Sequence, residues 1–174
     1  MKIGTFFYIS LTSTLISYAG INAMAQKPEP PVRVKKLLNA SFNGDAQEVQ
    51  RIIDKNKKCN QPLLSLSDND GNSALHRVCA IGYIVRKDGT SAGRAVYDKA
   101  DYPQTLAILL KEGANKTERN IYDESASDIL IKVDALIEKK LSTIEPQESS
   151  QESRKELLQN DRLTIIKLRE RLQE

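Results

Sequence analysis

The most informative part of the chain reads Asp68-Asn69-Asp70-Gly71-Asn72-Ser73-Ala74-Leu75-His76-Arg77-Val78-Cys79-Ala80-Ile81-Gly82. Asp70-Gly71 is typical of a tight turn, because glycine adopts the positive φ that such turns require. Ser73 follows the turn and precedes an apolar run, and serine is a preferred helix N-cap. The pattern therefore predicts a turn followed by a short helix that begins at Ala74 and ends near Gly82.

This stretch resembles the ankyrin-repeat motif, in which a turn leads into Thr-Pro-Leu-His and a helix that ends in glycine. Ser73, Ala74, Leu75 and His76 occupy the four motif positions. The resemblance implies that the His76 imidazole is structural and bonds to backbone near the connecting turn. It also implies a set of structural motif residues: Gly71, Ser73, Leu75, His76, Gly82 and Gly113.

The neighbouring sequence supports a short array of such units. In residues 36–67, Gly44 is expected to end a first helix, and an i, i+3, i+4 stripe, Val49, Ile52 and Ile53, predicts a second. The central unit, 68–119, continues with a similar stripe, Leu106, Leu109 and Leu110, after an insertion at 83–102. We expect the insertion to be a loop at its middle, with either a binding role or none.

The third unit, 120–141, is degenerate. Ser125 matches Ser73 and Asp128 matches His76, but no glycine marks a turn near Asp134, so its helix can continue to Leu141. The resemblance implies an all-α fold: an α-solenoid of about three ankyrin-like helix-turn-helix repeats over residues 36–141, with a C-terminal capping helix.

Both ends of the chain have a different character. Residues 1–25 have Lys2, an apolar run and a small-x-small ending, which predict a signal peptide cleaved before Gln26; a retained membrane anchor is the alternative. Residues 26–35 are a Pro-rich leader, and the folded part is expected to start near residues 32–36.

At the C-terminal end, residues 142–152 are predicted to be a polar linker, and 153–174 a helix. Four aliphatic residues of this helix fall on one face: Leu158, Ile165, Leu168 and Leu172. We expect the helix to fold back as a cap, the alternatives being self-association or the groove of a partner.

Length and charge set the broad class. The 174 residues suffice for one domain, and three Phe, six Tyr and no Trp imply an aliphatic core. With 26 basic and 23 acidic residues the net charge is +3, or +2 once Lys2 is removed with the signal peptide. So small a charge does not indicate nucleic acid or, after signal cleavage, a membrane as the partner, and we expect a monomer.

Catalytic chemistry has little support. The chain has one histidine, no Cys/His cluster with metal spacing and no glycine-rich phosphate loop, so we expect no enzyme, no catalytic residue, no metal and no cofactor. The two cysteines, Cys59 and Cys79, would enter an oxidising compartment and could form a disulfide. Alternatively, Cys79 is a buried thiol and Cys59 remains unpaired.

The resemblance implies an exported protein-binding module that recognises another protein through its turns, its concave face and the 83–102 insertion. Periplasmic residence, with protection or inhibition of a partner there, is the first expectation; a secreted effector directed at a host is the alternative. A hydrolase or redox enzyme would need a nucleophile and a base that the sequence does not offer. The expected partner-binding residues are six residues of the insertion with basic or aromatic side chains: Tyr83, Arg86, Lys87, Arg94, Tyr97 and Tyr102.

Overall fold

The computed structural model describes residues 31–57, 63–85, 91–94, 100–144 and 149–174. The predicted signal peptide lies outside these residues, as do residues 26–30 of the predicted leader. The described chain is helical, and its two short strands form one hairpin. The elements in chain order are α1 (Val32–Phe42), α2 (Ala46–Lys57), α3 (Ala74–Cys79), β1 (Tyr83–Val85), β2 (Ser91–Arg94), α4 (Tyr102–Lys111), α5 (Ala126–Ser142) and α6 (Ser149–Gln173).

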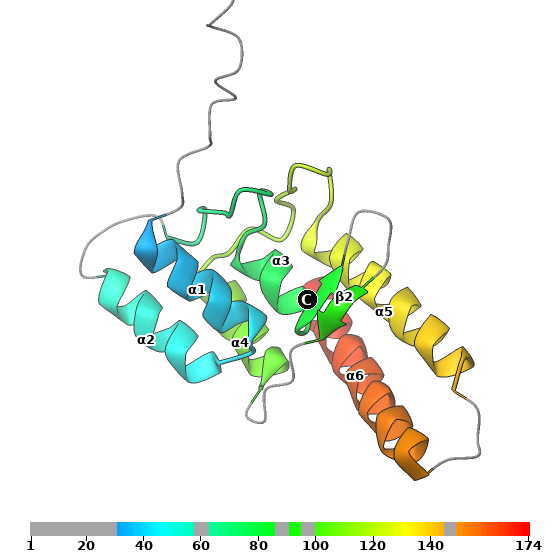
Figure 1. Cartoon of the computed structure of the whole chain (residues 1–174). Coiled ribbons are helices and arrows are strands. Elements are labelled where there is room, and N and C mark those ends of the chain that lie inside the picture. Colours follow the sequence, from blue (N-terminus) through cyan, green and yellow to red (C-terminus); the bar gives the residue numbers. More distant parts are fainter. Residues whose placement is uncertain (1–30, 58–62, 86–90, 95–99, 145–148) are drawn as a thin grey trace, which may run out of the picture.

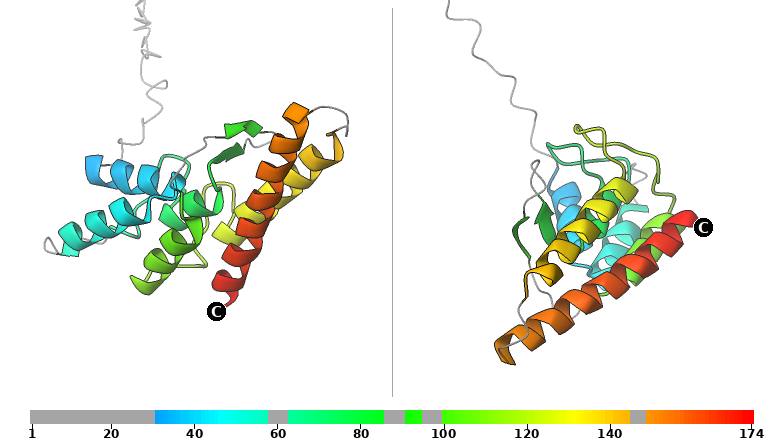
Figure 2. Two further views of the ribbon diagram at one scale, coloured as in Figure 1. Left: turned by 90° about the horizontal axis from the view of Figure 1, so that it is seen from below. Right: turned by 90° about the vertical axis from the view of Figure 1, so that its right-hand side faces the viewer.

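The helices are arranged in three successive pairs and two layers. Each odd-numbered helix packs on the helix that follows it, and α1, α3 and α5 lie side by side in one layer. The second layer consists of α2, α4 and α6. The pair α1–α2 is therefore at one end of the array and the pair α5–α6 at the other, as Figures 1 and 2 show.

Helix α1 begins at Val32, the first residue of the range in which the sequence predicted the folded part to start. It directly follows Pro31, and Val34 is buried with Leu37 and Leu38. These three residues have the i, i+3, i+4 spacing that places side chains on one helix face. The prediction that the leader extends to residue 35 is therefore wrong for residues 32–35, because burial of Val34 draws this segment into the helix.

The first pair is joined to the second through its turn. Gly44 has φ +67°, and a Cβ built there would lie 3.0 Å from the Tyr102 ring. The backbone N–H of Asp101 donates to the Gly44 carbonyl at 2.8 Å. Asp101 also caps α4, since its Oδ1 accepts from the Gln104 N–H at 3.0 Å. A side chain at position 44 would disturb this contact.

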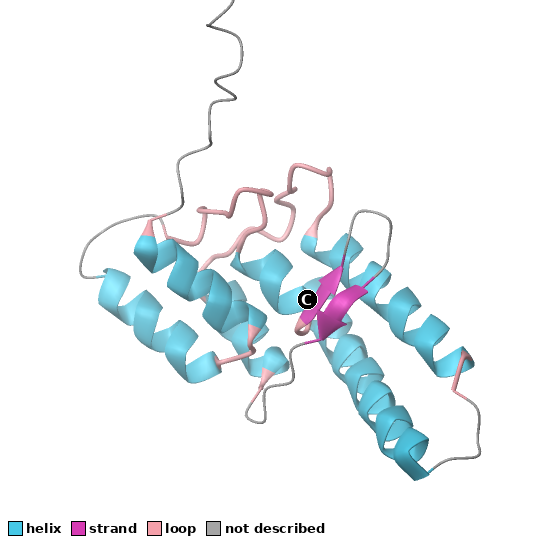
Figure 3. Ribbon diagram, viewed as in Figure 1, coloured by secondary structure: helices cyan, strands magenta, loops and turns pink. Residues whose placement is uncertain are grey.

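The insertion between α3 and α4 is partly ordered. Strands β1 and β2 pair antiparallel, with Tyr83 opposite Arg94, Ile84 opposite Gly93 and Val85 opposite Ser91. Figure 3 shows this hairpin beside the helices. The C-terminal limit predicted for the insertion, residue 102, needs correction, because Tyr102 is already the first residue of α4.

The C-terminal helix folds back, as the sequence predicted. Helix α6 packs on α5 and α4, and it buries Leu158, Ile165 and Leu168. Its boundary was wrong: α5 continues to Ser142 and α6 already begins at Ser149, so much of the predicted 142–152 linker is helical. Since α5 runs on without a turn, α6 takes the place of the second helix of the third pair and is not an additional cap.

Candidate functional site

Two turns lie against each other beside the N-terminal ends of α3 and α5. The N–H of Ile121 donates to the carbonyl of Asp70 at 3.0 Å, and Asn120 Nδ2 donates to Asn72 Oδ1 at 3.0 Å. Gly71 has φ +76°, and a Cβ there would be 2.9 Å from the backbone nitrogen of Ile121. This close approach leaves no room for a side chain, so the glycine is required for contact as well as for φ.

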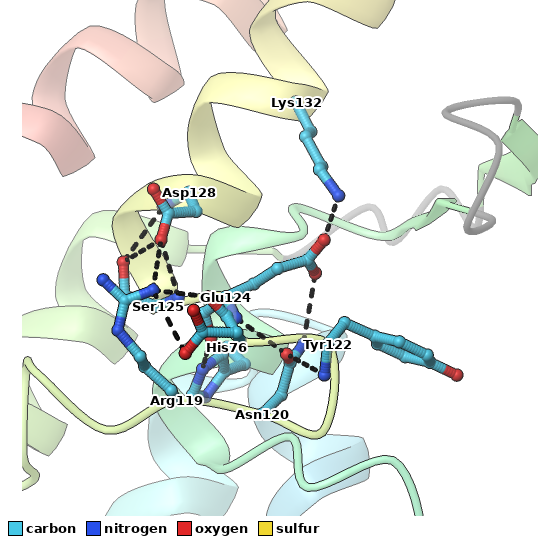
Figure 4. Close-up of polar contacts among 9 residues, drawn as sticks. His76, Arg119, Asn120, Tyr122, Glu124, Ser125, Asp128 and Lys132 are labelled. Atoms are coloured by element: carbon cyan, nitrogen blue, oxygen red, sulfur yellow. Dashed lines mark hydrogen bonds and ion pairs between the residues drawn. The ribbon is translucent and has the colours of Figure 1, made fainter.

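The His76 side chain links these two turns by hydrogen bonds (Figure 4). Its Nδ1 accepts from the Ser73 N–H at 3.2 Å and lies 2.8 Å from the Ser73 hydroxyl, while Nε2 lies 2.9 Å from the Glu124 carbonyl oxygen. Since Nδ1 is an acceptor, the proton is on Nε2, which donates to that carbonyl. The His76 side chain is buried. The imidazole therefore bonds to the backbone of two successive units.

Asp128 takes the corresponding position in the next unit. Its Oδ2 accepts from the Ser125 N–H at 2.9 Å and from the Ser125 hydroxyl at 2.8 Å. Both hydrogen bonds lower the pKa of the Asp128 carboxyl, and the bond from the Ser125 backbone N–H has the larger effect. The Arg119 guanidinium lies 3.7 Å from the same carboxylate and favours its charged form. A carboxylate thus replaces the imidazole where no further turn follows.

Two ion pairs stiffen the turns. Arg77 Nε donates to Asp68 Oδ2 at 3.0 Å, and Lys132 is paired with Glu124. Glu124 Oε2 also accepts from Asn120 Nδ2 at 3.2 Å. Figure 4 shows Lys132 and Glu124 on the side of the turn that faces the hairpin. These charges are satisfied within the chain, which leaves the neighbouring aromatic and aliphatic side chains as the groups open to a ligand.

A cleft of about 290 Å³ lies between the two turns, the end of α1, the hairpin and α5. Tyr122 and Ile84 line it and are 44% and 53% exposed. Phe42 lines it too, with the Arg77 guanidinium 5.9 Å from its ring centre. The negative charge of Asp70 is the largest cause that raises the pKa of the Tyr122 phenol. We refer to this site as the cleft.

The residues predicted for partner binding are distributed differently. Tyr83 and Tyr102 are 1% and 6% exposed and belong to the core, and Tyr83 also lines the cleft. Arg94 lies in β2 opposite Tyr83. Arg86, Lys87 and Tyr97 lie outside the described residues. Tyr83 is held inside by its hydrogen bond to Asp161, and Tyr102 lies against Gly44.

The residues of the cleft that sequence reasoning missed are Phe42, Ile84 and Tyr122. The sequence contained one indication for Tyr122. It lies in a turn, where an aromatic side chain is not needed for packing and so suggests a binding role. Phe42 ends a helix and Ile84 alternates with a buried tyrosine in a strand. Neither pattern shows which surface the residue borders until the hairpin is placed.

The cysteines give no support for a disulfide. Cys79 has a free thiol that is fully buried in α3, and burial raises its pKa to about 12. Cys59 lies outside the described residues. The environment of Cys79 is that of a small apolar core residue, with a thiol that is protonated at neutral pH.

The Ser73–His76 pair is buried. Ser73 and His76 are in hydrogen-bond contact, but each is only 2% exposed, so a substrate cannot reach the hydroxyl. Over the described ranges, no group of three or more His, Cys, Asp and Glu residues could hold a metal ion. No helix in that part of the chain has the length and apolar character needed to cross a membrane.

Comparison with protein-family models, with curated proteins and with solved structures gave no match to this chain.

Proposed function

We propose that this protein is an exported binding module of the ankyrin-repeat type that recognises another protein through the cleft. Its three helix pairs, with a glycine turn and a Ser73–His76 motif at the centre, support the repeat assignment. In an array of this kind each unit packs only on its neighbours, and binding surfaces lie along one side. Export, with the periplasm as destination, rests on the sequence of residues 1–25.

The observation that carries the binding proposal is that Tyr122 and Ile84 both line the cleft and are both exposed. Aromatic and aliphatic side chains in a hollow surrounded by polar groups are typical of interface hot spots. The ion pairs Arg77–Asp68 and Lys132–Glu124 hold the walls in place without needing a partner. A partner would place an apolar side chain between Tyr122 and Ile84.

The absence of catalysis is part of the proposal. The Ser73–His76 pair is used within the fold, since both nitrogens of the ring already bond to backbone groups. Neither Ser73 nor His76 is therefore free to activate a water or a nucleophile. We therefore propose that the module acts by binding its partner and not by catalysing a reaction.

A pull-down with the purified protein tests the cleft. Partner capture by Tyr122→Ala should fall at least about tenfold, the loss expected when an interface hot spot is truncated. Ile121→Ala is a matched control, because Ile121 is the adjacent residue, is 59% exposed and does not line the cleft. Capture that is unchanged by Tyr122→Ala, or reduced equally by both substitutions, would contradict the proposal.

Cell fractionation tests the location separately. Recovery of the processed chain from the periplasm supports a resident module, whereas recovery from the medium would favour the secreted alternative. A chain that stays in the membrane fraction with residues 1–25 attached would contradict cleavage.

A further inference from the structure

A second hollow lies at the other end of the array from α5 and α6, between α1 and α2. Its volume is about 300 Å³, and it shares no residue with the cleft. We refer to it as the end groove. It is lined by Val32, Arg33, Lys36, Arg51, Ile52, Lys55, Asn56 and Leu63.

The end groove is flanked by cations from both helices. Arg33 and Lys36 are one turn apart on α1, and Arg51 and Lys55 are one turn apart on α2. No carboxylate is among the described residues that line it. Arg51 is bonded to Glu48, and Arg33 and Lys55 also interact with other groups of the chain. The Glu48 carboxylate, whose pKa is lowered first by its hydrogen bond to Arg51 and also by the charge of Lys36, offsets part of this charge. The hollow therefore has an excess of positive charge, not four unopposed cations.

The floor between these cations is largely apolar, with the buried amide of Asn56 as its one uncharged polar group. Ile52 and Leu63 are 8% and 5% exposed and form the base of the groove, while Val32, which is 72% exposed, stands at its edge. A ligand that suits this site has an apolar group flanked by negative charges. An inorganic anion alone would leave the apolar floor without a partner.

The net charge of the chain lies in its first helix pair, although Lys35 and Lys57 of that pair do not line the groove and Lys57 is paired with Glu112. Residues 31–57 contain six basic and three acidic residues, a net charge of +3, which equals the net charge of all 174 residues. The remainder of the sequence is therefore neutral overall. A local excess of this kind attracts a partner of opposite charge and orients its approach, even where the total charge of the protein is small.

We propose that the end groove binds an acidic peptide segment of a partner protein, with one apolar side chain on Ile52 and Leu63 and carboxylates beside the four cations. A volume of about 300 Å³ is at the lower limit of ligand pockets, which suits one or two side chains better than a nucleotide or a larger cofactor. The inference is independent of the cleft, since neither site contributes a residue to the other.

The test uses fluorescence anisotropy of the full chain with a fluorescein-labelled peptide, Gly-Glu-Glu-Leu-Glu-Glu-Gly. The peptide should bind, and binding should weaken as NaCl is raised from about 50 mM to about 200 mM, because exposed charges are screened. A peptide with Gln in place of Glu should not bind. Equal binding of the Gln peptide would overturn the proposal.

Paired variants locate the site. Lys36→Gln with Lys55→Gln should weaken peptide binding roughly tenfold, the loss expected for two charge contacts of about 0.7 kcal/mol each. Lys35→Gln with Lys111→Gln removes the same charge from exposed positions on α1 and α4 outside the groove, and should change affinity less than about twofold. All four positions are exposed, so the fold should be kept, as circular dichroism would verify.

Two competition experiments test whether the groove prefers another anionic ligand. Vesicles of phosphatidylglycerol and phosphatidylcholine, and inorganic phosphate, are offered as competitors of the labelled peptide. Displacement by vesicles at lower concentrations than the unlabelled acidic peptide would overturn the proposal in favour of a lipid surface. Equal weakening by the two double variants would overturn it in favour of general charge attraction. Normal peptide binding by Tyr122→Ala is expected, so the two proposals can fail separately.

Discussion

The Tyr83 hydroxyl donates a hydrogen bond of 2.9 Å to Asp161 Oδ2, and both side chains are buried. Tyr83 begins the hairpin and Asp161 lies on α6, 78 residues farther along the chain. Lys140 of α5 places its ammonium 4.9 Å from the centre of the tyrosine ring. The insertion is therefore anchored on the last helix pair, which fixes the wall of the cleft that carries Ile84.

Tyr83→Phe should destabilise the protein by about 1–3 kcal/mol, because the buried Asp161 carboxylate loses a hydrogen-bond donor. Urea unfolding followed by circular dichroism measures this. Tyr122→Phe is the matched control. The Tyr122 hydroxyl is at the surface and its hydrogen bond to Asp70 is long, 3.4 Å, so the free energy of unfolding should change by less than about 0.5 kcal/mol. Equal effects of the two substitutions would show that the bond to Asp161 contributes nothing.

His76→Ala should lower the free energy of unfolding by about 2–4 kcal/mol, since it empties a buried position and leaves the Ser73 N–H without its acceptor. The Glu124 carbonyl loses one of its two hydrogen bonds and keeps the one from the Asn120 N–H. His76→Gln, which can replace one of the two bonds, should cost less. Unfolding in urea gives both values. If both variants were as stable as the wild type, the connecting role of the imidazole would be wrong.

Gly71→Ala should destabilise the protein more than Gly113→Ala. Both glycines have positive φ, +76° and +88°, so each alanine costs about 1–2 kcal/mol of backbone strain. A Cβ at position 71 would also meet the Ile121 nitrogen at 2.9 Å, whereas nothing lies within 4 Å of one at position 113. The two thermal midpoints measure the difference, and a reversed order would contradict the close contact between the turns.

Cys79 should react with a thiol reagent only after unfolding, since the thiol is buried and its pKa is raised to about 12. In the unfolded chain the thiol loses its proton near its ordinary pKa of 9.0, so the unfolded state binds fewer protons above that pH and stability falls between pH 9 and about 12. By pH 10 the free energy of unfolding should have fallen by about 1.4 kcal/mol through this thiol.

Cys79→Ala isolates this effect from other groups that titrate in the same range. The stability difference between wild type and Cys79→Ala should shrink by about that amount from pH 8 to pH 10. Rapid labelling of Cys79 in the native protein, or a difference independent of pH, would contradict the buried thiol.

Local signals in the sequence predicted the parts of the fold that depend on neighbouring residues. Ser73 predicted a helix beginning at Ala74, where α3 begins, and the spacing of Leu158, Ile165 and Leu168 predicted the face that α6 buries. Capping and helical periodicity act within one or two turns, so they are readable without the tertiary structure.

Boundaries and surface assignments were less predictable. Residues 149–152 looked like a polar linker but begin a helix, and Tyr83 and Tyr102 looked like contact residues but are buried. In each case the outcome depends on an element distant in sequence: Tyr83 is buried because Asp161 accepts its hydroxyl, and Tyr102 because it lies against Gly44.

The sequence by itself determined the helical class and the turn at Gly71, because both depend on short-range backbone geometry. The bond from His76 to the Glu124 carbonyl joins residues 48 positions apart and is seen only in the tertiary structure. Only the tertiary structure decided that Tyr122 and Ile84 share a cleft and that α6 completes the third helix pair. It also decided that Lys36 and Lys55 face one groove. These relationships arise from packing between elements far apart in the chain, and no local pattern encodes which side chains that packing leaves exposed.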